Sequence, residues 1–267
     1  MIVKCWTKDR QRVLSYIGAD YSRCLYLYLN LNKYGLDSNQ IEVYLQEKGG
    51  LMTAVLLKYY SCLHVYSREN CLLDSGEIGA FFADNGFTML YCAAETGAFI
   101  FPALPGAITA KATITNGWVA RIKCVDKGSK GLSVPAQAED FSQIVRLIYD
   151  DEDIGRSYNY EDLVRQLVER NEQGYARNLV IKERNQVIAH ICTNAEFGNI
   201  AVIAELLVRE EYRRKGYASE ILRSICEKLL SEGKEVYSFY YSEESRILHK
   251  HIGFYEICDW SKIVINK

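Results

Sequence analysis

A short basic segment holds the residues with the clearest chemical meaning. Three consecutive cations, Arg213-Arg-Lys215, stand directly before Gly216. The apolar run 200–208 before them predicts a strand, and spaced apolar residues after them predict an amphipathic helix. A helix N-terminus has unpaired backbone N–H groups and the positive end of the helix dipole, and glycine lets the backbone approach a ligand closely. The segment therefore predicts a site for an anion such as a pyrophosphate.

One acidic residue, Glu205, interrupts the apolar run before the basic turn. Its neighbours Ala204 and Leu206 would remove water from around the carboxyl, which suits a general base working near neutral pH. The alternative is a glutamate at a sheet edge that reaches solvent. The sequence leaves both interpretations open.

The spacing Arg213-x-x-Gly216-x-Ala218 resembles the acyl-CoA-binding signature of the GNAT superfamily of N-acetyltransferases, (Gln/Arg)-x-x-Gly-x-(Gly/Ala). Gly253-Phe254 stands where the family has a Gly-Phe pair that closes a later helix. The resemblance implies an acetyl-CoA-dependent N-acyltransferase that passes an acetyl group directly to a primary amine. Acetyl-CoA would be the co-substrate, and no metal is implied.

The resemblance also implies roles for single residues, with Glu205 as the base. Family members have Asn-x-x-Ala-x-x-Leu-Tyr-x-x-x-Gly-Phe, whose tyrosine protonates the leaving thiolate. That position is His249 here, and the role could instead have moved to Tyr241 or Tyr240, or been lost. The family's asparagine position is serine in this chain. The residues implied to bind CoA are Leu207, Val208, Arg213, Arg214, Lys215, Gly216, Tyr217, Ala218, Ser219 and Ser242.

The chain is expected to have an α/β fold (α+β, mixed sheet) with two GNAT-like domains, each a twisted mixed sheet flanked by helices. The domains expected are residues 1–130 and 136–267, divided at the polar stretch 126–135. The first half has a similar element order but no basic glycine turn. It therefore resembles the degenerate N-terminal copy of tandem-GNAT proteins.

Periodicity predicts the elements of both halves. In the first half these are helical segments over 10–32 and 78–82 and strands over 41–46, 51–59, 61–66 and 87–92. In the second half they are helices over 141–148, from 160 to a stop at Gly174, from 218 to near Gly233, and over about 243–250. The strands are 179–182, 187–192, 200–208 and 236–241, with a closing pair of strands over 254–265.

Composition limits the partners. The 267 residues are 49% hydrophobic and 25% charged with a net charge of -2, so the chain has no electrostatic footprint for nucleic acid. No run approaches the roughly 20 apolar residues of a membrane span, and the N-terminus does not read as a signal peptide. The nine cysteines lack a Cys-x-x-Cys pair, which favours free thiols over disulfides or zinc. We expect a cytoplasmic protein.

The acceptor is left open as a small-molecule amine or a protein amino group, and a homodimer is possible. The acidic run Asp150-Asp-Glu-Asp153 could attract a cationic amine or could simply cap helices. A different class of function is an acyl-CoA-binding sensor or scaffold with little turnover. Aminoacyl transfer from tRNA is disfavoured by the absence of net basic charge.

Overall fold

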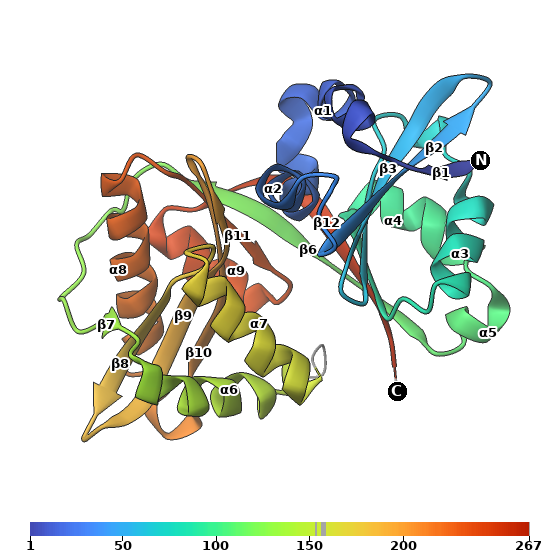
Figure 1. Cartoon of the computed structure of the whole chain (residues 1–267). Coiled ribbons are helices and arrows are strands. Elements are labelled where there is room, and N and C mark those ends of the chain that lie inside the picture. Colours follow the sequence, from blue (N-terminus) through green and yellow to red (C-terminus); the bar gives the residue numbers. More distant parts are fainter. Residues whose placement is uncertain (153, 156–158, 267) are drawn as a thin grey trace. The chain divides into compact units, whose positions relative to one another are not determined.

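The computed structural model describes residues 1–152, 154–155 and 159–266 and shows a mixed α/β fold with helices flanking mixed sheets (Figure 1). Two compact units are present, Met1–Val119 with Ile257–Lys267 and Ala120–Glu256. This division differs from the expected 1–130 and 136–267, because residues near the C-terminus pack with the first unit. Strands β6 (Ala112–Ile122) and β12 (Tyr255–Ile265) contribute residues to both units.

The first unit is a mixed sheet in the order β1-β2-β3-β4-β5-β12-β6. Only β4 and β5 pair in parallel among the registers that the structure records for this unit. Strand β12 runs antiparallel to β5, from Trp260↔Ala93 to Val264↔Met89. The remaining strands are β1 (Ile2–Lys4), β2 (Ile41–Lys48), β3 (Leu51–Tyr59), β4 (Cys62–Tyr66) and β5 (Met89–Ala93). The α-helices are α1 (Arg10–Ile17), α2 (Leu25–Tyr34), α3 (Ser75–Asp84), α4 (Ala94–Ile100) and α5 (Gly106–Thr109).

The second unit is a mixed sheet in the order β6-β11-β10-β9-β8-β7. Strands β10 and β11 pair in parallel, and β9 pairs antiparallel with both β10 and β8. The strands are β7 (Val134–Pro135), β8 (Asn178–Glu183), β9 (Gln186–Phe197), β10 (Ile200–Val208) and β11 (Glu235–Tyr240). The helices are α6 (Phe141–Tyr149), α7 (Tyr160–Glu172), α8 (Tyr217–Ser231) and α9 (Glu243–Ile252).

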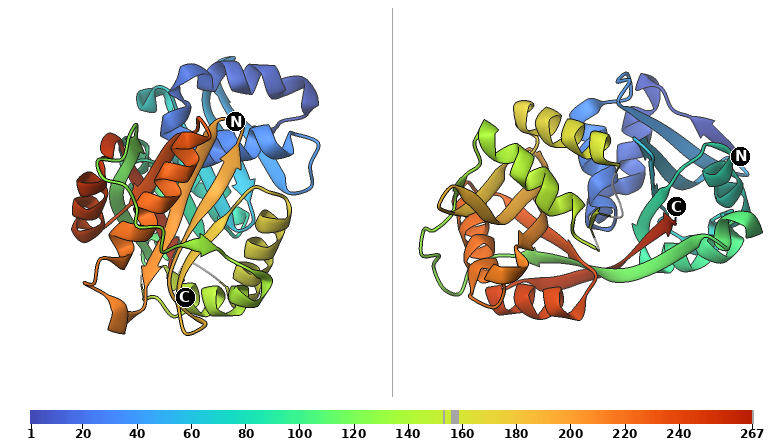
Figure 2. Two further views of the ribbon diagram at one scale, coloured as in Figure 1. Left: turned by 90° about the vertical axis from the view of Figure 1, so that its left-hand side faces the viewer. Right: turned by 90° about the horizontal axis from the view of Figure 1, so that it is seen from below.

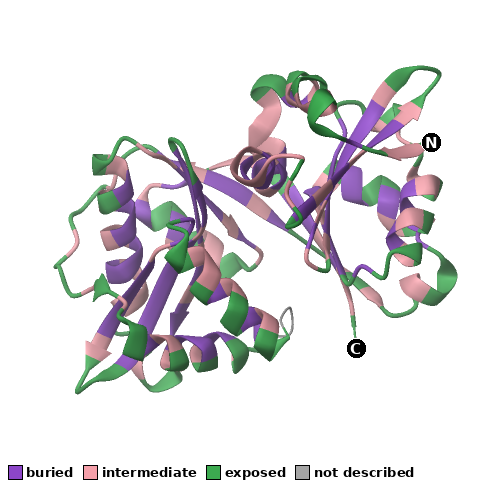
Figure 3. Cartoon of the chain, viewed as in Figure 1, coloured by how far each residue is buried: buried purple, intermediate pink, exposed green. Residues whose placement is uncertain are grey.

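Helices cover both faces of the second sheet. In Figures 1 and 2, α8 lies on one face and α6 and α7 lie on the other. The buried stripe of α8 includes Ile221, Leu222, Ile225 and Leu229, the face that helical spacing predicts. The strands are the most deeply buried parts of both units (Figure 3). The rigid sheet and α8 therefore provide a fixed frame for the turn between them.

Two expectations need correction. The expected pair of strands over 254–265 is one long strand, β12, because no turn residue interrupts its backbone. The expected linker 126–135 is not a free tether. Its backbone N–H groups at Lys130 and Leu132 donate to the buried Glu220 carboxylate at 2.8–3.2 Å, and Ser129 binds Glu227. The stretch is therefore fastened along α8.

Candidate functional site

The turn between β10 and α8 has a backbone shape that suits an anion. A short 3₁₀ turn (Glu210–Tyr212) precedes it. Arg214 then has φ +60 and Gly216 has φ +88, so both residues lie in the left-handed region. Turns that mix left- and right-handed residues point successive N–H groups into one concavity. Gly216 supplies this conformation without the steric cost that other residues incur.

The backbone N–H groups of residues 214–219 have no recorded hydrogen-bond acceptor within the described residues. Gly216 is the N-cap of α8 and makes no side-chain capping bond. The first intrahelical bond from this cap is donated by Glu220 N–H to the Gly216 carbonyl. Within the part of the chain that the structure describes, the N–H groups of residues 214–219 donate to no protein acceptor. An uncapped, exposed helix start with the dipole behind it is a strong site for phosphate oxygens.

The predicted cationic support is only partly available. Arg213 N–H donates to the Glu210 carbonyl, and Arg213 Nε donates to the Val208 carbonyl at 3.1 Å. Lys215 Nζ donates to the Glu211 carbonyl at 2.9 Å. The side chains of Arg213 and Lys215 therefore stabilise the backbone of the turn. All three cations are exposed and lack a recorded ion pair within the described residues, and Arg214 is the one whose side chain makes no recorded backbone bond. The backbone of residues 214–219, with Arg214 beside it, is called the cradle below.

Strands β10 and β11, which pair in parallel, separate from each other beside the cradle. Their register runs only from Ile200↔Glu235 to Ile203↔Ser238, although β10 continues to Val208. Leu207 and Val208 still pair with β9 on the other side. The β11-facing side of this last part of β10 therefore has no ladder partner among the described strands. The predicted role of Leu207 and Val208 as backbone partners for an extended ligand requires such an open side.

A β-bulge sets Glu205 apart from the rest of β10. Ala204 pairs with Cys192 and Leu207 pairs with His190, so two residues of β10 face one residue of β9. Glu205 has φ +55, an unfavourable backbone conformation for a non-glycine residue, and its side chain is buried. Bulges and strained residues are found often at active sites, where they redirect a side chain.

Two buried polar residues on β9 lie against Glu205. Cys192 Sγ donates to Glu205 Oε2 at 3.3 Å. His190 Nε2 lies 2.9 Å from Asn178 Oδ1, and burial lowers the pKa of His190 to about 3, while the Glu205 backbone raises it. Sequence reasoning missed both residues, because nothing in an apolar strand shows which of its positions will face a bulge on the next strand.

His249 does not have the setting of a proton donor. It is buried, its Nδ1 lies 2.7 Å from the Ser245 carbonyl, and its Nε2 lies 2.9 Å from Ser238 Oγ. Burial lowers the pKa of His249 to about 4, and the bond to the Ser245 backbone opposes this only in part. The ring is neutral at pH 7 and links α9 to β11. This setting argues against the donor role inferred from the sequence.

The tyrosines after β11 differ from each other. Tyr240 is buried and donates to Glu256 at 3.3 Å, and burial followed by the nearby Glu256 charge raises its pKa. Tyr241 follows the end of β11 and is half-buried. Ser242, the predicted CoA contact, is the N-cap of α9 and accepts from Ser245 N–H at 3.2 Å. Its hydroxyl therefore already caps a helix.

The Gly-Phe pair has a packing reason. Gly253 ends α9 with φ +115, and a Cβ at this position would lie 2.8 Å from the Cys124 carbonyl oxygen. Any larger residue would have to move that backbone. Phe254 contacts the His249 ring edge-on, with 5.1 Å between ring centroids. The pair therefore fixes α9 and does not itself face the cradle residues.

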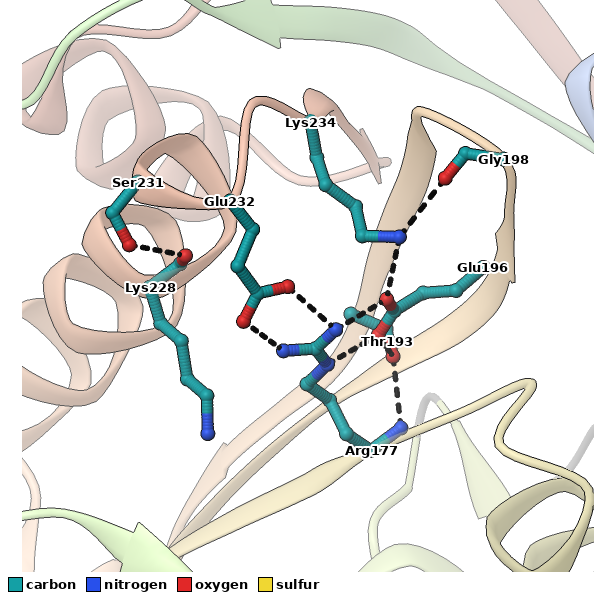
Figure 4. A network of polar contacts seen from close by, with 8 residues as sticks. All are labelled: Arg177, Thr193, Glu196, Gly198, Lys228, Ser231, Glu232 and Lys234. Atoms are coloured by element: carbon teal, nitrogen blue, oxygen red, sulfur yellow. Dashed lines mark hydrogen bonds and ion pairs between the residues drawn. The ribbon is translucent and has the colours of Figure 1, made fainter.

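The far end of α8 is held by a network of charged and polar groups (Figure 4). Arg177 donates to Glu196 at 2.6 Å and to Glu232 at 2.8–2.9 Å. Lys234 also lies 3.4 Å from Glu196, which is buried. Hydrogen bonds to both carboxylates raise the pKa of Arg177. The network anchors the helix whose other end forms the cradle.

The first unit has a helix start in a comparable place, but it is already occupied. Helix α3 follows β4 and precedes β5, as α8 follows β10 and precedes β11. Its N-cap Asp74 accepts from Glu77 N–H at 3.0 Å, and Glu77 in turn accepts from Ile2 N–H and Gln46. The carboxylate of Asp74 therefore already caps the helix start where an anion would bind.

Four further features considered in the sequence are the acidic run after α6, the cysteines, metal ligands and membrane-spanning helices. Asp150 to Glu152 follow α6, and Asp153 lies outside the described residues. The cysteines are free thiols, of which Cys71 and Cys124 are exposed. Within the ranges that the structure describes, no cluster of three or more potential metal ligands is present. No helix in those ranges is long and apolar enough to cross a membrane.

Comparison with known proteins agrees with this geometry. Residues 141–256 match the model of the acetyltransferase (GNAT) family. No curated protein matches the chain. This family domain contains the cradle, the bulge and both diverging strands.

Solved structures share the fold over the whole chain. A GNAT-family acetyltransferase from Colwellia psychrerythraea has a TM-score of 0.60 at 11% identity, covering 100% of both chains. A GCN5-related N-acetyltransferase from Sphaerobacter thermophilus has 0.63 at 14% identity, covering 100% of this chain and 96% of its own. A tandem GNAT protein from the clavulanic acid biosynthesis pathway has 0.59 at 11% identity, covering 100% and 98%. At these identities the likeness concerns the fold alone.

The fold and the cradle together define an acetyltransferase domain in the second unit. Residues 141–256 are thus identified as a GNAT acetyltransferase domain by the family model that they match.

Proposed function

We propose that the protein is an acetyl-CoA-dependent N-acyltransferase that transfers an acetyl group directly to a primary amine. The uncapped N–H groups of residues 214–219, beside the point where β10 and β11 separate, are the observation that carries this proposal. They suit the pyrophosphate of CoA, and the open side of β10 next to them suits the amide groups of its pantetheine arm. The family match supports the same donor.

In the proposed reaction, which is a direct acyl transfer, two residues move protons. The amine nitrogen forms a bond to the acetyl carbonyl carbon, the carbon–sulfur bond breaks, and the sulfur leaves as a thiolate. Glu205 accepts the proton that the amine loses, and Tyr241 gives a proton to the thiolate. We assign the donor role to Tyr241 because it is half-buried directly after β11, whereas His249 is buried with both ring nitrogens engaged.

We infer that the first unit is a copy of the same fold that has lost its donor site. Its strands β4 and β5 are parallel, as β10 and β11 are in the second unit. Asp74 and Glu77 occupy the start of its α3 helix. One CoA molecule should therefore bind per chain, and calorimetry measures this stoichiometry.

An acyl-CoA-binding sensor is the alternative function. It is favoured by His249, which stands at the family's donor position with both ring nitrogens engaged. A sensor would bind acetyl-CoA without releasing CoA thiol.

Two measurements separate these functions. Calorimetry with acetyl-CoA should show binding at sub-millimolar concentration, and its absence would contradict both functions. Release of CoA thiol across a panel of amines should then show turnover. Glu205→Gln and Tyr241→Phe should each lower kcat by about 100-fold, within the usual range for loss of acid–base catalysis, with unchanged affinity for acetyl-CoA. Glu172→Gln, an exposed residue at the end of α7, is the matched control.

A further inference from the structure

The bulge in β10 brings the proposed base against a thiol. In a regular strand, side chains alternate between the two faces of the sheet. Here Glu205 and Leu206 together face Ile191, and the extra residue interrupts this alternation. The Glu205 carboxylate is thereby placed 3.3 Å from Cys192 Sγ. The same sulfur lies 3.6 Å from the Ala204 carbonyl oxygen.

The thiol is suited to be a permanent donor. Cys192 is only 2% exposed and Glu205 only 8% exposed, so water does not compete strongly for their contact. Burial, and then the charge of Glu205, raise the pKa of Cys192 well above its usual value. The S–H group therefore keeps its proton and can donate it to a carboxylate oxygen.

Two other titratable groups act near this pair, Arg170 and His190. Arg170 on α7 lowers the pKa of Cys192 through its charge, but by less than burial and Glu205 raise it. His190 on β9 is neutral and acts on the Glu205 backbone, not on the carboxylate. The contact of Cys192 differs from theirs, because its Sγ donates a hydrogen bond to the carboxylate oxygen of Glu205 itself.

We propose that Cys192 is a positioning residue, whose S–H group holds the Glu205 carboxylate in the orientation from which it accepts the proton of the amine. The inference rests on the proposed function for the meaning of that orientation. The hydrogen bond between Cys192 and Glu205 can be tested without measuring catalysis. A base that is held in place saves the entropy of finding its geometry, and misplacement by about 1 Å can cost about 100-fold in rate.

Infrared difference spectroscopy of the S–H stretch tests the bond without any substrate. The difference between wild type and Cys192→Ala isolates the band of Cys192. We expect this band at lower frequency than that of Cys226, a buried thiol on α8 isolated in the same way with Cys226→Ala. Glu205→Gln should move the Cys192 band toward that of Cys226. A Cys192 band that Glu205→Gln leaves unchanged overturns the inference, whatever the protein catalyses.

Turnover tests the consequence of the bond. Cys192→Ala, which removes the donor with a small loss of volume, and Cys192→Val, which removes it with a gain of about one methyl group, should each lower kcat about tenfold or more while the calorimetric affinity for acetyl-CoA stays the same. Cys192→Ser retains a donor and should keep most of the activity, and Cys226→Ala should match wild type. Equal kcat in the Val, Ala and Ser variants overturns the positioning role even if the band shifts. Failure of the wild type to bind acetyl-CoA would instead overturn the proposed function, and the band measurement would still decide the hydrogen bond.

Discussion

Arg213 Nε donates to the carbonyl oxygen of Val208 at 3.1 Å, across the turn that joins β10 to α8. The most characteristic cation of the sequence motif therefore shapes the protein backbone. The anion is left to the N–H groups of residues 214–219 and to the exposed charge of Arg214. Two kinds of arginine, adjacent in sequence, are expected to behave differently in binding experiments.

Salt distinguishes the two arginines. Arg213→Ala removes the bond to Val208 together with an exposed charge and should weaken CoA binding about tenfold, or roughly 1.4 kcal/mol, and the part that comes from the bond should persist at high salt. Arg214→Ala removes an exposed charge, and its smaller effect should disappear at 0.5–1 M salt, where the Debye length is only about 3–4 Å. Calorimetry with CoA at two salt concentrations measures both. Equal salt sensitivity in the two variants would refute the assignment.

Gly216 can be tested against a glycine at the other end of the same helix. Gly216 and Gly233 have φ +88 and +76, and a Cβ at either position would meet nothing within 4 Å. Alanine at either position should therefore cost about 1–2 kcal/mol of folding stability from the left-handed conformation. Only Gly216→Ala should also lose affinity for CoA, because only that turn holds the cradle. If Gly233→Ala weakens CoA binding as much, the cradle is misplaced.

His249 should make the protein sensitive to mild acid. Burial lowers its pKa to about 4 in the folded protein from the ordinary value of 6.5, so the unfolded chain binds the proton more readily between these values. Because the folded protein keeps this ring neutral, the free energy of unfolding is highest above pH 6.5 and decreases as the pH falls toward 4. The decrease in the free energy of unfolding is at most roughly 3 kcal/mol.

Variants isolate this contribution in urea unfolding measured from pH 7.5 to 4. His249→Gln should be less stable at pH 7.5, because it loses the link to Ser238, but should lose less stability on acidification than wild type. His251→Gln is the control, because His251 is exposed on the same helix. A His249→Gln variant with the same acid dependence as wild type would show that this ring is not the acid-sensitive group.

The network behind α8 should contribute more than a surface ion pair. Arg177→Ala leaves the carboxylate of the buried Glu196 with the recorded bond from Thr193 and the longer contact to Lys234. We expect a loss of about 3–5 kcal/mol in the free energy of unfolding, as for other buried pairs that lose one partner. Arg165→Ala removes an exposed i,i+3 pair with Asp162 and should cost less than about 0.5 kcal/mol. Urea unfolding compares the two, and similar losses would contradict the network's role.

Local patterns predicted the elements around the cradle well. The apolar run Ile200–Val208 is β10, and the spacing of α8 gave its buried face. The turn between β8 and β9 also follows from local chemistry, since Arg184 and Asn185 both have positive φ as short hairpin turns require. These features depend on residues close together in sequence.

Features that depend on pairing across strands could not be predicted. The bulge at Glu205 arises only when β10 and β9 are placed in register, and the contact with Cys192 follows from that register. The commitment of His249 to Ser238 likewise needs α9 and β11 together. The sequence also could not show that β12 pairs with β5, because strand partners distant along the chain leave no periodic signal.

The pairing of Trp260 with Ala93 has a consequence for how the chain is made. During synthesis Ala93 leaves the ribosome long before Trp260 exists, so β5 must wait with one edge unpaired while nearly all of the second unit is translated. Contacts between residues so distant along the chain slow folding, since a large loop must close before they form. The nascent first unit should therefore depend on chaperones until translation is almost complete. For the same reason, a gene fragment that encodes only residues 136–267 would give a product whose β12 lacks its neighbour.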